Sequence, residues 1–169
     1  MPWEDIIMPA VISATIKSYI AGFLDGDGCI MFQLVRRKDY IYGYQIRASI
    51  VFYQKRTYYP HLEWLKSIFR NGYLRIRKDN MAEYTIVGIK DVCKVIKLLR
   101  PYVRLKKEHI KLALNIEKEL NKKLTLKNFL RICRLVDKYK ELNYSKKRTN
   151  TSKQVEQYLK EHNLYPRND

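Results

Sequence analysis

The sequence is poor in acidic residues, in cysteine and in histidine. Its 169 residues include 17 Asp and Glu against 34 Lys and Arg, which gives a formal net charge of +17 at pH 7. The three cysteines, Cys29, Cys93 and Cys133, are widely spaced and form no CxxC pair. This pattern indicates neither a disulfide framework nor a zinc cluster, and it favours a reducing compartment.

Long apolar runs are also missing. The N-terminal segment is apolar in places, but it carries Glu4, Asp5 and Lys17 and lacks the basic start of a signal peptide. No run reaches membrane-spanning length, so the sequence predicts a soluble protein without membrane contact. With 46% hydrophobic residues, the chain is long enough to bury the core of one compact domain.

The excess of basic residues indicates a polyanionic partner. The alternative is that the lysines only solvate helix faces, but at this net charge we favour nucleic acid. The sequence shows no Walker loop and no HNH-like run among His61, His109 and His162, so it does not indicate those nucleotide-binding and nuclease types.

Apolar periodicity predicts an α+β fold in the order αββαββα, with further helices at the C-terminus. Helical spacing of apolar residues recurs in residues 13–25, 60–69, 92–99, 110–120 and 129–139. Strand-like alternation recurs in residues 29–35, 45–53, 73–77 and 83–87. Thr151 and Gln154 have the spacing of a capping box, which predicts the start of a last helix.

One face of the predicted sheet is polar, and we expect it to stay open while helices cover the apolar face. Gln and Arg hydrogen-bond to base edges in a major groove that is wide enough to admit a β-ribbon. The candidate DNA-binding residues are Gln33, Arg37, Tyr40, Gln45, Arg47, Ser49, Tyr53, Arg75, Arg77 and Thr85. The alternative is a solvated sheet face that binds nothing.

The most informative segment is residues 20–28, with the sequence IAGFLDGDG. Ala21 and Gly22 remove side-chain bulk, which allows a second helix to approach at backbone distance. A two-fold axis through such a helix pair would bring one Asp27 from each subunit together, and paired carboxylates bind Mg²⁺. Asp25 and Asp27 could instead bind amides of a turn, an interpretation that we favour for Asp25 alone.

Residues 20–28 resemble the LAGLIDADG motif, because they match its Ala-Gly pair, both acidic positions and the closing glycine. The resemblance covers residues 13–143 and is greatest to the single-motif, homodimeric homing endonucleases that are encoded in introns. It implies a saddle-shaped antiparallel sheet that binds double-stranded DNA. It also implies a metal-dependent, staggered double-strand cut in a long pseudo-palindromic target.

The expected catalytic residues are Asp27, Gln54 and Lys106. Asp27, helped by the Gly26 carbonyl, would hold Mg²⁺, for which Mn²⁺ could substitute, whereas Ca²⁺ would bind without supporting cleavage. The resemblance places Gln54 where it would orient a water and Lys106 where it would stabilise charge on the phosphate. The expected dimer interface consists of Tyr19, Ile20, Ala21, Gly22, Leu24 and Asp25.

Two positions depart from the family pattern. A basic residue often found four places after the glutamine is Tyr58 here, and an acidic strand residue appears as Glu83. Lys55 or Arg56 could supply the missing positive charge, and Arg104 and Lys107 lie close to Lys106 in sequence.

In the segment SKKR, residues 145–148, Lys146 and Arg148 resemble the phosphate-binding residues of a C-terminal loop and should add affinity without sequence choice.

The resemblance also sets expectations for domain organisation, location and partners. We expect an N-terminal extension at 1–12, an endonuclease domain at 13–143, and a basic link with a C-terminal helix at 144–169. The protein should act in the compartment that holds its target genome, either a prokaryotic cytoplasm or an organelle. The alternative is a non-cleaving binder of the same fold, such as an RNA maturase or a DNA-binding regulator, with intron RNA the less favoured partner.

Overall fold

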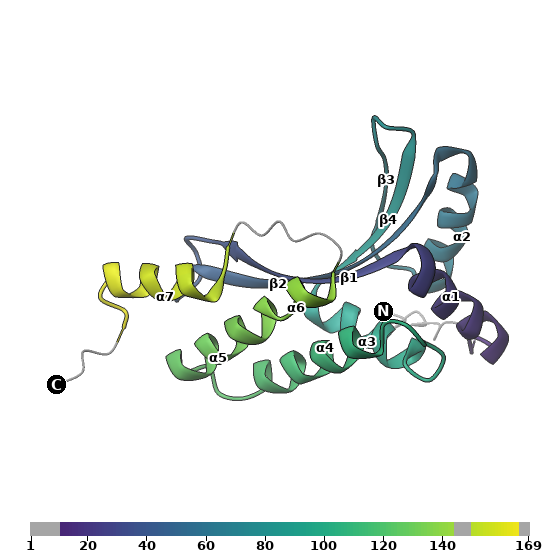
Figure 1. Cartoon of the computed structure of the whole chain (residues 1–169). Coiled ribbons are helices and arrows are strands. Elements are labelled where there is room, and N and C mark those ends of the chain that lie inside the picture. Colours follow the sequence, from purple (N-terminus) through teal and green to yellow (C-terminus); the bar gives the residue numbers. More distant parts are fainter. Residues whose placement is uncertain (1–10, 144–149, 166–169) are drawn as a thin grey trace, which may run out of the picture.

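Four antiparallel strands form one sheet in the order β1-β2-β4-β3. The strands are β1 (Gly28–Arg36), β2 (Tyr44–Lys55), β3 (Tyr73–Ile76) and β4 (Met81–Val87). The computed structural model describes residues 11–143 and 150–165. Every predicted strand is present, and the α+β class and the αββαββα order are confirmed (Figure 1).

The helices follow the predicted order and differ from it mainly at their ends. They are α1 (Ala14–Asp27), the single-turn 3₁₀ helix η1 (Arg56–Tyr58), α2 (Tyr59–Phe69), α3 (Ile89–Leu99), α4 (Lys107–Leu120), α5 (Leu126–Asp137), α6 (Tyr139–Leu142) and α7 (Ser152–Glu161). Within the residues that the structure describes, none of the helices is long and apolar enough to span a bilayer.

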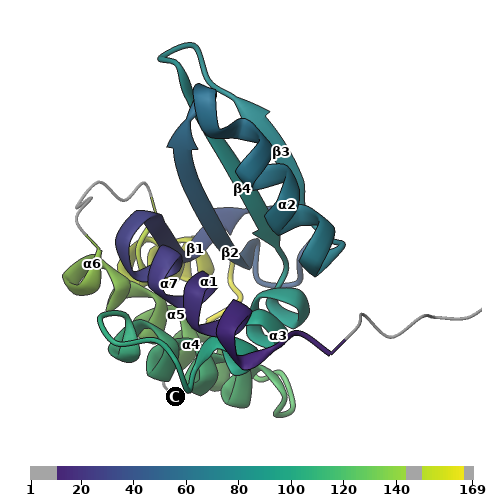
Figure 2. The same cartoon turned by 90° about the vertical axis from the view of Figure 1, so that its right-hand side faces the viewer.

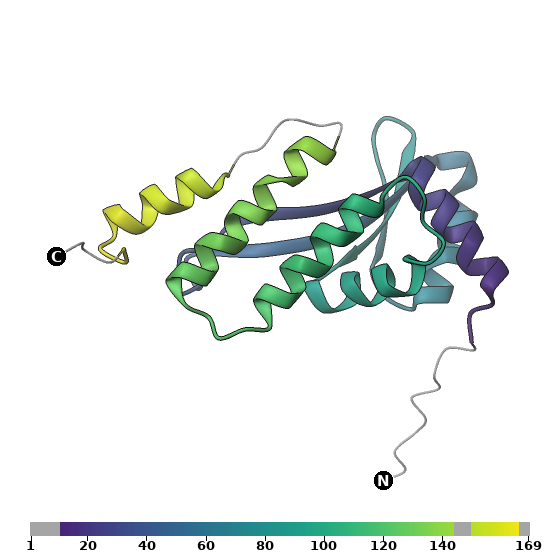
Figure 3. The ribbon, with the colours of Figure 1, turned by 60° about the horizontal axis from the view of Figure 1, so that its bottom comes forward.

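The two faces of the sheet differ as the alternation predicted. Side chains such as Ile30, Phe32, Ile50 and Phe52 are fully buried on the side where α1, α3 and α5 pack. The views in Figures 1 and 3 show α4 and α5 running beneath β1 and β2. Among the described residues, no helix packs along most of the opposite side. In Figure 1, β3 and β4 rise from the plane of β1 and β2, so this open side is concave.

Helix α1 runs directly into β1 and ends at Asp27, two residues later than predicted. The Ser13 hydroxyl accepts the N–H of Ile16 at the start of α1, and the N–H of Gly28 reaches the Leu24 carbonyl at its end. A Cβ on Gly28 would lie 2.6 Å from the Leu24 side chain and 2.8 Å from its backbone, so only glycine fits this junction. The junction places Asp27 where the helix meets the sheet.

Two peripheral helices brace the ends of the sheet. Figure 2 shows α2 lying against β3 and β4. Helix α7 packs on α5, with Val155 and Leu159 fully buried, and the predicted capping box of Thr151 and Gln154 is confirmed at its start. The Tyr158 ring fills the space beside Gly43, whose φ of +72° and missing side chain allow the contact at the β1–β2 turn.

Candidate active site and nucleic-acid interface

The end of α1 brings together two residues that the sequence assigned to catalysis. Asp27 is exposed, and its Oδ2 accepts a hydrogen bond of 3.1 Å from Nε2 of Gln54 at the end of β2. The Gln54 Oε1 accepts the main-chain N–H of Lys55 at 3.2 Å, which fixes the orientation of the amide. The amide therefore presents its NH₂ group to the carboxylate, and the other carboxylate oxygen has no partner among the hydrogen bonds of the described residues.

Asp25 points to a different part of the chain. Its carboxylate accepts three successive main-chain N–H groups, from Arg104 at 2.7 Å, Leu105 at 3.1 Å and Lys106 at 3.1 Å. The Lys106 Nζ in turn donates to the main-chain carbonyl of Asp25 at 2.9 Å. The amide-binding interpretation of Asp25 therefore matches the geometry, although the amides come from the α3–α4 loop. Its expected place in the dimer interface stays a prediction.

A hollow of about 900 Å³ opens beside these residues, and its lining includes Gly26, Asp27, Cys29, Tyr53, Lys106 and His109. Three of the expected catalytic and metal-binding residues, Gly26, Asp27 and Lys106, thus line one cavity. Burial raises the pKa of the Cys29 thiol, and the positive charge of Lys106 partly offsets this effect. At ordinary pH, Cys29 is therefore a neutral thiol rather than a nucleophilic thiolate.

His109 belongs to this hollow, although the sequence argument used it only to exclude other nucleases. It lies one helical turn after Lys106, a spacing that could have pointed to it. Its Nε2 lies 3.1 Å from Oδ1 of Asn143, and among the described residues its buried Nδ1 has no hydrogen-bond partner of good geometry. Burial lowers the pKa of His109 and Lys106 lowers it further, against the raising effect of the hydrogen bond to Asn143.

The donor set at the helix end fits a hard divalent ion in an open site. The described residues include no group of three or more His, Cys, Asp and Glu side chains that could form a closed metal cage. The groups that could bind a metal ion at the end of α1 are the exposed carboxylate of Asp27 and the carbonyl of Gly26, and both offer oxygen ligands. Mg²⁺ fits such a set because it keeps several waters and is commonly completed by substrate phosphate oxygens.

The two basic residues that could supply the positive charge missing at Tyr58 do not line the hollow beside Asp27. Lys55 and Arg56 are exposed and line a second hollow of about 630 Å³, together with Asp79 and Asn80 at the β3–β4 turn. Tyr58 itself is also exposed. The proposal that Lys55 or Arg56 supplies the missing charge stays a prediction.

The open sheet face presents most of the predicted DNA-binding residues. Gln33 of β1 pairs with Arg47 of β2, and both are exposed. Arg37 and Tyr40 are exposed in the β1–β2 turn, while Gln45 and Tyr53 are half-buried. Lys146 and Arg148 lie outside the residues that the structure describes.

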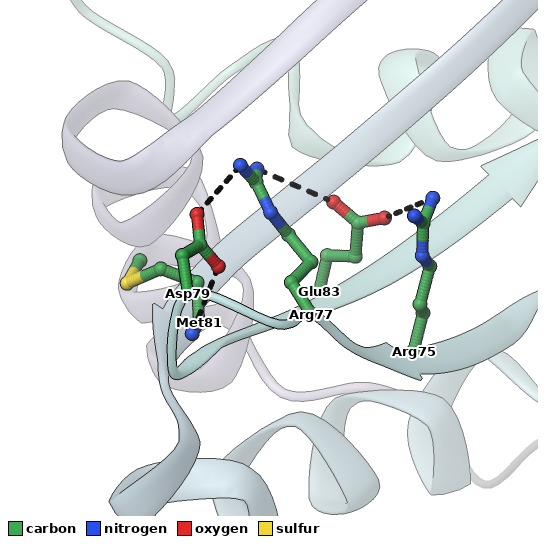
Figure 4. A network of polar contacts seen from close by, with 5 residues as sticks. All are labelled: Arg75, Arg77, Asp79, Met81 and Glu83. Carbon is green, nitrogen blue, oxygen red and sulfur yellow. Dashed lines mark hydrogen bonds and ion pairs between the residues drawn. The ribbon is translucent and has the colours of Figure 1, made fainter.

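Two arginines of this face share one carboxylate (Figure 4). Glu83 lies 3.4 Å from Arg75 and 4.0 Å from Arg77, and Arg77 also contacts Asp79 at 2.7 Å. The carboxylate of Glu83 is mostly buried, whereas both guanidinium groups are substantially exposed. The pairing restrains the two arginines while leaving their donors accessible at the surface.

Ser49 and Thr85 correct the predicted contact surface. Both lie on the open face, as the alternation predicted, but only 4% of Ser49 and 5% of Thr85 is exposed. They occupy the two central strands, where short side chains lie below their neighbours on either side. In the free chain these two residues therefore lie in the floor of the sheet and expose little surface for a contact with DNA.

Part of the predicted dimer face is buried within the chain itself. Ile20, Ala21 and Leu24 have no exposed area, because they form the face of α1 that packs into the chain's own core. Gly22 lies on the opposite face, is exposed, and has nothing within 4 Å of where a Cβ would be. Tyr19 is 52% exposed and its hydroxyl bonds to His61 of α2 at 2.9 Å. The surface available to a second copy therefore centres on Gly22.

Comparison with known proteins places this arrangement in a class of DNA-acting proteins. The LAGLIDADG endonuclease family matches residues 20–111, which include the helix-end carboxylates, the whole sheet and Lys106. The chain is 36% identical over 143 residues to DNA endonuclease I-CvuI from Chlorella vulgaris, covering 85% of the chain and 89% of that protein. It is 32% identical over 142 residues to DNA endonuclease I-CreI from Chlamydomonas reinhardtii, covering 83% and 86%. The chain therefore belongs to the LAGLIDADG endonuclease family.

Solved structures agree with this assignment. The homing endonuclease I-CvuI in complex with its target, in the presence of Ca, superposes with a TM-score of 0.80 at 35% identity, covering 86% of this chain and 92% of that one. I-CvuI with an I-CreI target in the presence of Mg gives a TM-score of 0.82 at 34% identity, covering 89% and 96%. The archaeal intron-encoded I-Vdi141I, complexed with DNA, has a TM-score of 0.76 at 18% identity and covers 88% and 97%, so it supports the fold alone.

Proposed function

We propose that this family member is a site-specific homing endonuclease that cuts both strands of a long, pseudo-palindromic DNA target by metal-dependent hydrolysis. The observation that carries this proposal is the exposed Asp27 carboxylate at the end of α1, bonded to Gln54 and placed in one hollow with Lys106. Two relatives that are more than 30% identical to it are both named DNA endonucleases. The solved structures of one of them contain target DNA.

Each of the three polar residues would contribute a separate effect to phosphodiester hydrolysis. Asp27 and the Gly26 carbonyl would hold the divalent ion, which lowers the pKa of the attacking water and offsets charge on the phosphate. Gln54, its amide already oriented by Asp27 and by the Lys55 amide, would align the water. Lys106 would donate to the phosphate oxygen on which negative charge builds up.

The ion proposed is Mg²⁺, with Mn²⁺ as a substitute and Ca²⁺ as an ion that binds without turnover. The oxygen-only donor set of Asp27 and Gly26 supports a hard ion. Structures of I-CvuI were obtained with both Ca and Mg. The protein would work in the compartment that holds its target genome.

The working unit would be a homodimer. One chain offers one exposed Asp27 and one open sheet, whereas a double-strand cut needs two such centres. Gly22 leaves the exposed face of α1 without a side chain, which lets the same helix of a second copy approach closely. Each sheet would then follow about one turn of major groove, giving a target on the order of 20 base pairs.

The decisive experiment separates binding from chemistry with Asp27→Asn. We expect the variant to lose Mg²⁺-dependent cleavage by about a thousandfold, because the charge that holds the ion is gone while the sheet is unchanged. The duplex is one that the wild-type protein selects by cleavage from a random library. Gel shifts in Ca²⁺ measure binding, and single-turnover assays in Mg²⁺ measure cutting.

Two outcomes would count against the proposal. Cleavage by Asp27→Asn at the wild-type rate would remove Asp27 from the active site. A wild-type protein that binds the selected duplex or intron RNA tightly but never cuts DNA would favour the alternative, a maturase or a DNA-binding regulator. Asp91→Asn, at a half-buried position in the first turn of α3 and outside the proposed site, serves as the matched control and should cut normally.

A further inference from the structure

We infer that Asp25 is a positioning residue for Lys106, so that the first acidic residue of the helix end acts on catalysis through the lysine of a distant loop. The inference rests on the proposed function, which gives Lys106 a role at the phosphate. The two residues are 81 positions apart in sequence, yet Asp25 contacts both the backbone and the side chain of Lys106.

The main-chain amides of the α3–α4 loop form an anion-binding run that is held by the Asp25 carboxylate. Three successive N–H groups, those of Arg104, Leu105 and Lys106, converge on one carboxylate. Successive main-chain N–H groups form a natural site for an anion, and the positive end of a helix reinforces it. Helix α4 begins at Lys107, and Lys106 provides no side-chain cap of its own. The Asp25 carboxylate therefore binds the amide of the N-cap residue Lys106 and the two amides before it, at the N-terminal end of α4.

The side chain of Lys106 is held by the same residue. Its Nζ donates to the Asp25 carbonyl at 2.9 Å, which brings the ammonium group next to Gly26 and two residues before Asp27. A lysine side chain is flexible and places a compact charge only when its stem and head are restrained. With its backbone and its head both tied to Asp25, the ammonium group is placed beside the metal-binding end of α1 before DNA arrives.

A purely structural role for Asp25 makes a different prediction. If the carboxylate only stabilises the α3–α4 loop, its loss should lower stability and reduce cleavage in the same way whether or not Lys106 is present. If it positions Lys106, its loss should have little further effect once the ammonium group has been removed. A double-mutant cycle separates these two cases.

The experiment compares Asp25→Asn, Lys106→Met and the double variant with the wild-type protein, all full-length, on the library-selected duplex. We expect Asp25→Asn to lower the single-turnover rate in Mg²⁺ by about 30-fold with Ca²⁺ gel-shift affinity within about threefold of wild type. In the Lys106→Met background the same change should lower the rate by less than about twofold. Single-turnover rates are read from bound complexes, so a smaller folded fraction changes the amplitude and not the rate.

A matched control tests whether the effect is specific. Glu108→Gln removes a negative charge from an exposed side chain two residues after Lys106, where it pairs only with Lys111 among the ion pairs of the described residues. It should cut at the wild-type rate. Asp25→Ser, which keeps one oxygen acceptor, is the second variant in case Asp25→Asn does not fold.

The possible results distinguish failure of the inference about Asp25 from failure of the role proposed for Lys106. Equal rate losses from Asp25→Asn with and without the Lys106 ammonium group would overturn the inference, as would failure of both Asp25 variants to fold. If Lys106→Met is inactive and Asp25→Asn fully active, the inference fails and the proposed function stands. If Lys106→Met cuts at the wild-type rate, the role proposed for Lys106 itself is removed.

Discussion

At the scale of single residues, burial controls the chemistry of the hollow as much as residue type does. His109 is held on α4 near Lys106, and Asn143 bonds one of its ring nitrogens. Burial and the nearby positive charge lower its pKa from the usual value of 6.5, so the fold favours the neutral ring. At a pH between the lowered pKa of the folded chain and the ordinary pKa of 6.5, the unfolded chain binds a proton at His109 more readily than the folded chain does. Stability is therefore complete above about pH 6.5 and falls as the pH drops through it.

This residue gives a prediction about acid stability. His109→Gln, which removes the titrating ring, should flatten the fall in melting temperature between about pH 7 and pH 5, because one proton no longer distinguishes the folded and unfolded states. Thermal unfolding followed by circular dichroism across that range measures the effect. Parallel pH profiles for the wild-type protein and the variant would contradict the assignment.

At the scale of secondary structure elements, the β3–β4 hairpin presents two arginines that one carboxylate restrains. Glu83 pairs with Arg75 directly across the strands, and Arg77 follows at the end of the hairpin. Two restrained guanidinium groups with free outward donors suit bidentate contacts to guanine. The hairpin should therefore read particular base pairs, whereas basic residues outside the sheet should contact phosphates.

The contrast can be measured by substitution. Arg75→Ala and Arg77→Ala should each relax base preference at a few adjacent positions and cost about 1–3 kcal/mol there. Lys146→Ala should instead weaken binding to all sequences alike and reduce the salt dependence. Cleavage of a library with single base-pair changes supplies both profiles. A uniform loss from all three variants would mean that the arginines act only by their charge.

At the scale of the whole molecule, the open sheet and the exposed face of α1 support the proposal that two chains act together as a symmetric dimer. The core face of α1 is used up within the chain, and the Gly22 face is left for a partner. The division into segments 1–12, 13–143 and 144–169 stays a prediction. Helix α7, which belongs to the last segment, packs on α5 and beside the β1–β2 turn.

Dimerisation is tested by filling the space at Gly22. Gly22→Leu should keep the melting temperature of the isolated chain, since a side chain there meets nothing within 4 Å, but it should separate the two α1 helices and abolish cleavage. Equilibrium sedimentation, free and on DNA, measures the assembly. A wild-type protein that stays monomeric in both conditions, or a fully active Gly22→Leu dimer, would refute the packing argument.

The sequence by itself determined the features that depend on neighbouring residues. Apolar periodicity gave the strands, the helices and their buried faces, because side-chain direction repeats with the local backbone geometry. The spacing of Thr151 and Gln154 gave the last helix cap, and the motif at residues 20–28 pointed to the family. The catalytic roles of Gln54 and Lys106 were expected only through the resemblance, and the hydrogen bond between Gln54 and Asp27 was seen only in the structure.

Tertiary structure decided the features that depend on residues far apart in the chain. Periodicity does not fix strand order, so the central position of β2 and β4, and with it the burial of Ser49 and Thr85, followed only from the assembled sheet. The motif did not show which face of α1 packs inward, and Ala21 proved to belong to the core. Asp25 found its partners about 80 residues away, because a carboxylate near a helix end binds whichever free amides the packing brings to it.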